Sequence, residues 1–151
     1  MAAHPGDILT YWRNAGPSRW FARSAAFDDA IRLKFEAVHH AAARGAYAGW
    51  EASADGALAL VILLDQFPRN LFRGSAHAFA TDPLALSIAR RAIAAGMDQE
   101  VEPLLRPFFY LPFEHSEALP DQDECVRLCQ AHAKACGDEE TLKWAVLHRD
   151  I

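Results

Sequence analysis

The longest strongly apolar stretch of the chain runs from Gly56 to Leu64, and few structures can accommodate it. Asp55 can cap a helix at its start, and Pro68 closes the helix just after Phe67. A helix that is apolar on every side has to be covered on every side, so the stretch predicts a central helix. It is far shorter than the roughly 20 residues that a membrane-spanning helix needs, and a buried strand is the less favoured alternative.

The segments around this stretch also carry helix signals. Thr81-Asp82-Pro83, followed by residues 84–95 and then Gly96, combines a capping residue, a proline in the first turn and a glycine after the end. Apolar residues recur at helical spacing from Phe27 towards Gly45, and His39-His40 near that end predict positive charges on a solvated face.

Weaker patterns complete the secondary-structure prediction. They predict helices over 7–12, 119–135 and 138–150, a connection at Trp20 and Phe21, and at most short helical pieces across 101–113, where three prolines fall. No segment alternates as a strand does. The sequence therefore predicts an all-α domain built from antiparallel helical hairpins.

Composition and charge narrow the class of protein further. The 151 residues fit one domain over 1–151, and 52% hydrophobic with 23% charged residues excludes a disordered chain. Fifteen basic and twenty acidic residues leave a net charge of −5, so we expect neither a nucleic acid nor an anionic membrane as partner. No lysine or arginine lies within 1–7, as a secretory signal would need, and the cysteines are odd in number, which predicts a cytoplasmic protein with free thiols.

A polar cluster follows directly on the apolar stretch. Its members lie among large apolar residues and are Asp65, Gln66, Arg69, Asn70 and Arg73. Buried polar groups need partners, so one interpretation is a structural network in which Asp65 pairs with an arginine and Arg69 or Asn70 bonds the last helix carbonyls. The other is a ligand site, in which the two guanidinium groups bind a carboxylate or phosphate and Asn70 orients it.

His115-Ser116-Glu117 lies in a proline-flanked connection after an aromatic stretch. A histidine near a carboxylate is the composition of a general acid–base pair, so His115 and Glu117 are candidate catalytic residues. Residues two apart do not face each other on a helix, and Glu117 is also placed to precede the helix over 119–135. Ser116 lacks the strand-turn-helix setting of a nucleophilic serine.

Soft metal ligands form one stripe, which comprises Cys125, Cys129, His132 and Cys136. They lie within about 40° of one another at 100° per residue, but the stripe is about 16 Å long at a helical rise of 1.5 Å. One ion could reach only a neighbouring pair, and no second pair of suitable spacing occurs elsewhere. We therefore expect the cysteines to act as small core residues, and we predict neither a metal site nor a cofactor.

Longer motifs carry a resemblance to a known family. They are Leu63-Leu64-Asp65-Gln66-Phe67-Pro68-Arg69-Asn70, Phe72-Arg73-Gly74, Ala78-Phe79-Ala80-Thr81-Asp82, Pro112-Phe113-Glu114-His115-Ser116-Glu117 and His148-Arg149-Asp150-Ile151, with Trp12, 56–60 and Gln122 in addition. With these the chain resembles, over essentially its whole length, the uncharacterised bacterial family called domain of unknown function 924. The resemblance implies a tetratricopeptide-like helical fold, although the sequence shows no convincing repeat of that period. It assigns no activity, and it implies a further C-terminal segment that this chain lacks.

Three functions are compatible with these patterns. The favoured one is binding of a small anionic ligand or a peptide carboxylate in a groove lined by residues 65–73. The alternatives are a hydrolase that uses His115 and a carboxylate, and a protein-interaction scaffold whose polar cluster is structural. Because Trp144, Val146 and Leu147 add apolar surface to the last helix, we also expect either a homodimer that covers it or a monomer with frayed final turns.

Overall fold

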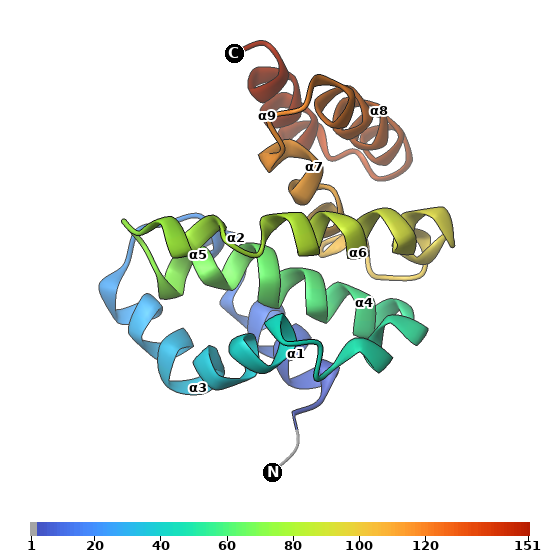
Figure 1. The fold of residues 1–151 in the computed structure, drawn as a ribbon. Coiled ribbons are helices and arrows are strands. Elements are labelled where there is room, and N and C mark those ends of the chain that lie inside the picture. Colours follow the sequence, from blue (N-terminus) through green and yellow to red (C-terminus); the bar gives the residue numbers. More distant parts are fainter. Residues whose placement is uncertain (1–2) are drawn as a thin grey trace.

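The computed structural model describes residues 3–151, and these form an all-α fold with no strand among them (Figure 1). The α-helices are α1 (Pro5–Ala15), α2 (Pro17–Trp20), α3 (Ala25–Ala43), α4 (Ala54–Val61), α5 (Phe67–Leu71), α6 (Asp82–Ala94), α7 (Leu111–His115), α8 (Leu119–Cys136) and α9 (Glu139–Arg149). Short 3₁₀ turns cover Ala48–Ala52, Ala76–Phe79, Met97–Gln99 and Arg106–Phe109, and a π-helical turn covers Ile62–Gln66. The predicted fold class is confirmed.

Helix α4 lies at the centre of the fold, as the apolar stretch predicts. Every residue from Gly56 to Gln66 is buried, and α4 contacts α1 on one side and α6 on another. Ser53, not Asp55, caps α4 by accepting a hydrogen bond from the Gly56 N–H, while Asp55 is an exposed first-turn residue. A β-carbon on Gly56 would lie 2.1 Å from the Trp50 carbonyl oxygen, so the 3₁₀ turn before α4 packs this closely only because residue 56 is glycine.

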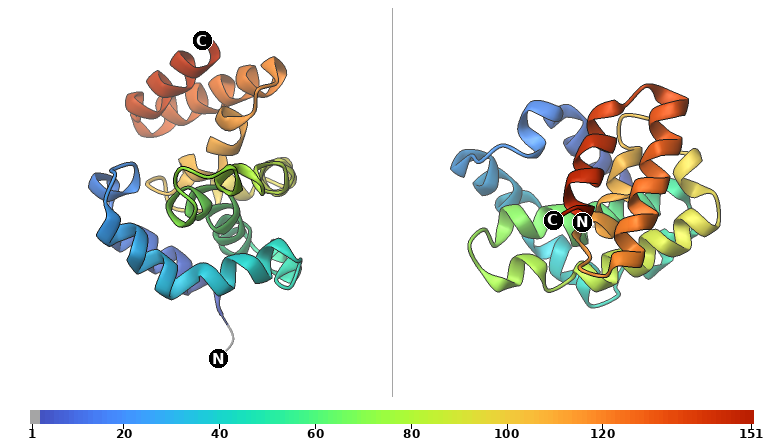
Figure 2. Two further views of the ribbon diagram at one scale, coloured as in Figure 1. Left: turned by 60° about the vertical axis from the view of Figure 1, so that its left-hand side comes forward. Right: turned by 90° about the horizontal axis from the view of Figure 1, so that it is seen from above.

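The helices form two groups. Helices α1, α3, α4, α5 and α6 enclose the main core, whereas α8 and α9 form an antiparallel hairpin above α6 (Figures 1 and 2). Helix α7 connects the two groups, because it contacts α6 on one side and both α8 and α9 on the other. Because α7 contacts α9 as well as α6, side chains of α9 lie close to those of α7 near the main core.

Several local predictions are confirmed. The helices predicted from Phe27 towards Gly45, over 119–135 and over 138–150 are α3, α8 and α9. Ser24 caps α3, Gly137 ends α8 in the left-handed conformation with φ of 76°, and Asp138 caps α9 by accepting from the Thr141 N–H. The connection predicted at Trp20 is wrong, because Pro17 starts the short helix α2 there and Trp20 is buried.

The cysteine stripe divides into a buried and an exposed part. Cys125 and Cys129 are buried core residues, as predicted, but Cys136 is exposed at the end of α8. Within residues 3–151 no three histidine, cysteine or acidic side chains converge as metal ligands. No helix in the same range combines the length and the apolar character needed to cross a bilayer.

Candidate functional site

The prediction that Pro68 closes the central helix is wrong, because a π turn carries the helix past it. The Phe67 N–H bonds the Ile62 carbonyl, five residues back, so it is not available to the Leu63 carbonyl, and Pro68 has no N–H to offer. Two side chains donate to the freed carbonyls instead. His39 Nδ1 donates to the Leu63 carbonyl oxygen at 2.8 Å, and the Thr81 hydroxyl donates to the Leu64 carbonyl oxygen at 2.6 Å. Side chains from α3 and from the start of α6 therefore stabilise the turn.

His39 was predicted on a solvated face, and this too is wrong. The side chain is buried against the π turn, and burial lowers its pKa more than its bond to the Leu63 carbonyl raises it. Burial therefore favours the neutral imidazole, and in that form the ring proton is on Nδ1, which donates to the Leu63 carbonyl.

The π turn buries Asp65 completely and directs it to α7. One carboxylate oxygen lies 2.8 Å from Nδ1 of His115, and the other accepts from the Gln66 amide at 2.9 Å. Carboxylate oxygens accept hydrogen bonds, so the proton of a neutral His115 ring is on Nδ1, and Nε2 presents a lone pair. The His115 side chain is 18% exposed, and its Nε2 has no protein hydrogen-bond partner among the described residues.

Arg69 bonds both a backbone carbonyl and a carboxylate. Its guanidinium donates to the Asp65 carbonyl, as the structural interpretation predicts, and makes two bonds of 2.9 and 3.0 Å to the Asp82 carboxylate. Its distance to the Asp65 carboxylate is longer, at 3.6 Å. Burial opposes the charged form, but the bonds to Asp82 and the negative charge of Asp65 still raise the pKa of Arg69, so the guanidinium stays charged.

Asn70 and Arg73 converge on a different carboxylate. Asp28 of α3 accepts one bond from Asn70 at 2.9 Å and two from Arg73 at 2.8 and 3.1 Å. Burial alone would raise the pKa of Asp28, yet these three bonds and the charge of Arg73 hold it below its ordinary value. The predicted cluster thus divides into a group around Asp65 and a group around Asp28, and each arginine already faces a carboxylate. Binding of an anion between Arg69 and Arg73 stays a prediction.

His115 and Glu117 are not brought together. Helix α7 ends at His115, the backbone at Ser116 turns to an extended conformation with ψ of 141°, and Glu117 is exposed. The Ser116 hydroxyl donates to Asp121 at 2.7 Å, and its oxygen accepts from the Ala118 N–H. Ser116 therefore shapes the start of α8, and the carboxylate beside His115 is that of Asp65.

Glu114 and His148 join this group, although sequence reasoning did not select them. Glu114 is buried, and its carboxylate lies 3.7 Å from Nδ1 of His148 on α9, which bonds the Trp144 carbonyl at 2.8 Å. Burial raises the pKa of Glu114 more than the two neighbouring histidines lower it, and the nearby charge of Asp65 raises it further. The aromatic residues just before Glu114 are a sequence signal for this burial. We call Asp65, Glu114, His115 and His148 the central cluster.

The arrangement defines a class: an all-α helical protein in which a buried aspartate pairs with a partly exposed histidine. The model of the family described as "Bacterial protein of unknown function (DUF924)" matches residues 8–151, and the chain belongs to this family. A search of curated proteins found no significant match.

A solved structure supports the fold. The chain is similar to a protein of unknown function from Agrobacterium tumefaciens, with 46% sequence identity and a TM-score of 0.90 over 97% of this chain and 80% of that one. The family and this relative support the all-α class without assigning an activity, and the tetratricopeptide-like description stays a prediction.

Proposed function

We propose that this chain is a hydrolase-type enzyme in which His115 acts as general base. The observation that carries the proposal is the 2.8 Å contact between His115 Nδ1 and the fully buried carboxylate of Asp65. A carboxylate that accepts from Nδ1 fixes the tautomer and orientation of the ring, and it stabilises the imidazolium that forms when Nε2 takes a proton.

Water is the nucleophile that fits this site best. The Ser116 hydroxyl is committed to Asp121, so it is not directed at the His115 ring. In the proposed reaction Nε2 of His115 removes a proton from water, and the water oxygen adds to the carbonyl carbon of an ester. Collapse of that adduct breaks the bond to the leaving-group oxygen, which takes the proton of Glu114. The proton on Nε2 of His115 then passes to the Glu114 carboxylate, so both groups return to their starting states.

Glu114 is suited to the acid role because burial favours its protonated form. The two carboxyl groups have different surroundings, because Asp65 is bonded to the base and Glu114 is desolvated. Such a difference allows one site to hold an acid and a base together. The charged guanidinium of Arg69 and the imidazole of His148 are partly exposed beside the pair, with side-chain exposures of 24% and 43%. They favour a small ester that itself carries a negative charge.

The test compares two chromogenic esters, neutral p-nitrophenyl acetate and anionic mono-p-nitrophenyl succinate. We expect saturable hydrolysis of the anionic ester, and we expect His115→Gln to lower kcat/KM by about 100-fold or more. His77→Gln is the matched control, because His77 is exposed on the 3₁₀ turn before α6 and lies outside the central cluster. Equal rates in wild type and His115→Gln, or no saturable rate with either ester, would overturn the proposal.

A second readout does not depend on the choice of ester. Nitrogen chemical shifts of the His115 ring report which nitrogen carries the proton, and we expect the Nδ1–H tautomer in the wild type. In Asp65→Asn we expect that preference to weaken, and we expect the pH profile of hydrolysis to shift, which a pair with only a structural role would not cause.

We further propose that the protein works in the cytoplasm. Its three cysteines are unpaired, which suits a reducing compartment. Cell fractionation tests this directly, and recovery of the protein in an extracytoplasmic fraction would contradict it.

A further inference from the structure

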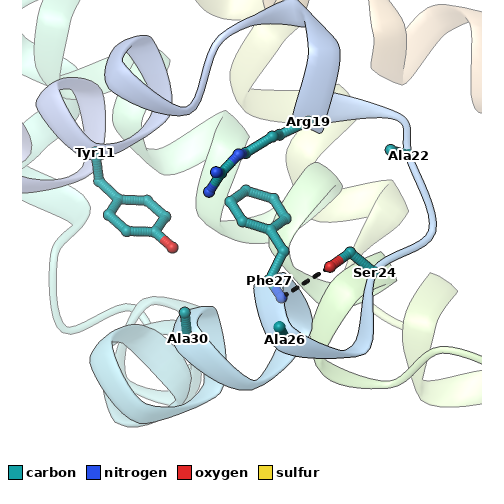
Figure 3. A pocket seen from close by; sticks show the side chains of 7 residues that line it. All are labelled: Tyr11, Arg19, Ala22, Ser24, Ala26, Phe27 and Ala30. Atoms are coloured by element: carbon teal, nitrogen blue, oxygen red, sulfur yellow. Dashed lines mark hydrogen bonds between the residues drawn. The ribbon is translucent and has the colours of Figure 1, made fainter.

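A hollow lies between α1, α2 and the start of α3 (Figure 3). It encloses about 310 Å³, close to the lower end of the range for small-molecule sites. The residues that line it are Tyr11, Arg19, Ala22, Ser24, Ala26, Phe27 and Ala30. None of these belongs to the central cluster, so the hollow is a separate feature of the fold.

The apolar part of the hollow is formed by aromatic and very small side chains. The rings of Tyr11 and Phe27 lie 6.1 Å apart between centroids and only 9° from parallel, which gives a flat wall. Ala26 and Ala30 are four residues apart on α3 and so share a face, where their single methyl groups leave space. The shape fits a flat, apolar body such as an aromatic ring.

The polar part consists of hydrogen-bond donors. The Arg19 guanidinium extends into the hollow towards Tyr11 in Figure 3, and it makes no ion pair or side-chain hydrogen bond within residues 3–151. The Tyr11 hydroxyl has no partner over the same range. Ser24 Oγ accepts from the Phe27 N–H at 3.2 Å, which leaves its own hydroxyl proton free to donate.

The acidic residues on this part of α3 are neutralised elsewhere. Asp28 is bonded twice to Arg73, and Asp29 bonds Arg32 at 2.5 Å. Lys34 lies 5.7 Å from the Tyr11 ring and adds a second positive charge near the wall. Burial also raises the pKa of Tyr11, so its hydroxyl keeps its proton and remains a donor.

We propose that this hollow binds a small aromatic carboxylate. The carboxylate is bonded by Arg19 and by the Tyr11 hydroxyl, and the ring packs against Phe27 and the two alanines. Arginine is the side chain whose paired N–H groups match the two oxygens of a carboxylate. The proposal stands apart from the hydrolase proposal, because it uses different residues on different helices.

The probes are benzoate, its neutral isostere benzamide and inorganic phosphate, each titrated into the labelled full chain and followed by amide NMR. We expect benzoate to give saturable shifts in the millimolar range at Ala22, Ala26 and Ala30. Benzamide lacks the negative charge of benzoate, and phosphate lacks its apolar ring. We therefore expect each of them to bind at least about tenfold more weakly than benzoate, a factor that equals 1.4 kcal/mol.

Variants separate the site from general charge effects. Arg19→Gln should weaken benzoate binding about tenfold or more, and Tyr11→Phe should weaken it to a smaller degree because only a hydroxyl is lost. Arg23→Gln is the matched control, since it removes the same charge from an exposed residue that does not line the hollow. Equal weakening by both arginine variants, shifts scattered over the surface, or no saturable shift would each overturn the proposal.

Discussion

Replacing Asp65 by alanine should destabilise the protein by about 3 kcal/mol. The carboxylate is fully buried and accepts bonds from His115 and Gln66, and bonds to a charged group contribute roughly 1.5–3 kcal/mol each. The loss of two such bonds is partly offset, because the partly exposed His115 can bond water and a desolvated charge is removed.

The pairing of Arg69 explains why the loss of stability in Asp65→Ala is not larger. If Asp65 were its main partner, Asp65→Ala would leave a buried guanidinium unpaired and would cost about 3–5 kcal/mol for that reason alone. The structure pairs Arg69 with Asp82 through two bonds, so its charge keeps a partner in the variant. The cost therefore arises from the His115 and Gln66 donors.

Urea denaturation measures this directly, provided that the slope of the unfolding free energy against urea is unchanged. For a chain of this size about 3 kcal/mol corresponds to a fall in Tm of about 6–12 °C. Asp123→Ala is the control, because Asp123 is exposed on α8 and should change stability by less than about 0.5 kcal/mol. A change that small in Asp65→Ala as well would refute the burial and the bonding inferred for Asp65.

Three further predictions concern pH and association. Asp28 has a lowered pKa in the folded state, so its contribution to stability is present above its ordinary pKa and is lost as the pH falls through the folded value; Asp28→Asn should flatten the acid limb of a denaturation profile. Glu114 has a raised pKa, so its contribution is present at low pH and is lost as the pH rises through the folded value. Glu114→Gln should therefore gain stability relative to wild type as the pH rises above the ordinary pKa of a glutamate. Trp144 and Leu147 are 48% and 44% exposed on α9, so we expect light scattering to show a dimer that a Trp144→Ser, Leu147→Ser double variant converts to a monomer.

Each of these predictions has an outcome that contradicts it. An unchanged acid limb in Asp28→Asn would mean that Arg73 does not hold that carboxylate charged. A pH-independent difference between Glu114→Gln and wild type would mean that Glu114 titrates normally. A constant monomer mass across protein concentration would show that the apolar face of α9 has no second copy as partner.

The helices that sequence reasoning found are those whose signals lie within a few residues. Helix α6 has its threonine, proline and glycine at its own ends. Gly137 separates α8 from α9, and Asp138 caps α9. The π turn was missed because its stabilising donors are distant: His39 and Thr81 lie 24 and 17 residues from the carbonyls they bond. From the local sequence a proline predicts a helix end, and here the helix continues past Pro68 because donors from distant parts of the chain bond the freed carbonyls.

The candidate site shows the same limit. Asp65 and His115 were each selected from their surroundings, but His115 was matched with Glu117 because the two are close in sequence. Their actual arrangement depends on a contact across 50 residues, and the extended backbone at Ser116 turns Glu117 away. Side-chain composition can nominate residues for a site, whereas packing of the helices decides which of them meet.

The central cluster is assembled from three elements that do not follow one another in the chain. Asp65 comes from the π turn, Glu114 and His115 from α7, and His148 from α9, and α7 contacts α9 as well as the α6 layer. A displacement of α9 relative to α7 would separate His148 from Glu114, whereas the Asp65–His115 contact joins the π turn to α7 and does not involve α9. The acid of the proposed reaction is therefore more sensitive to the position of α9 than the base is, because the base is bonded to a carboxylate of the buried core.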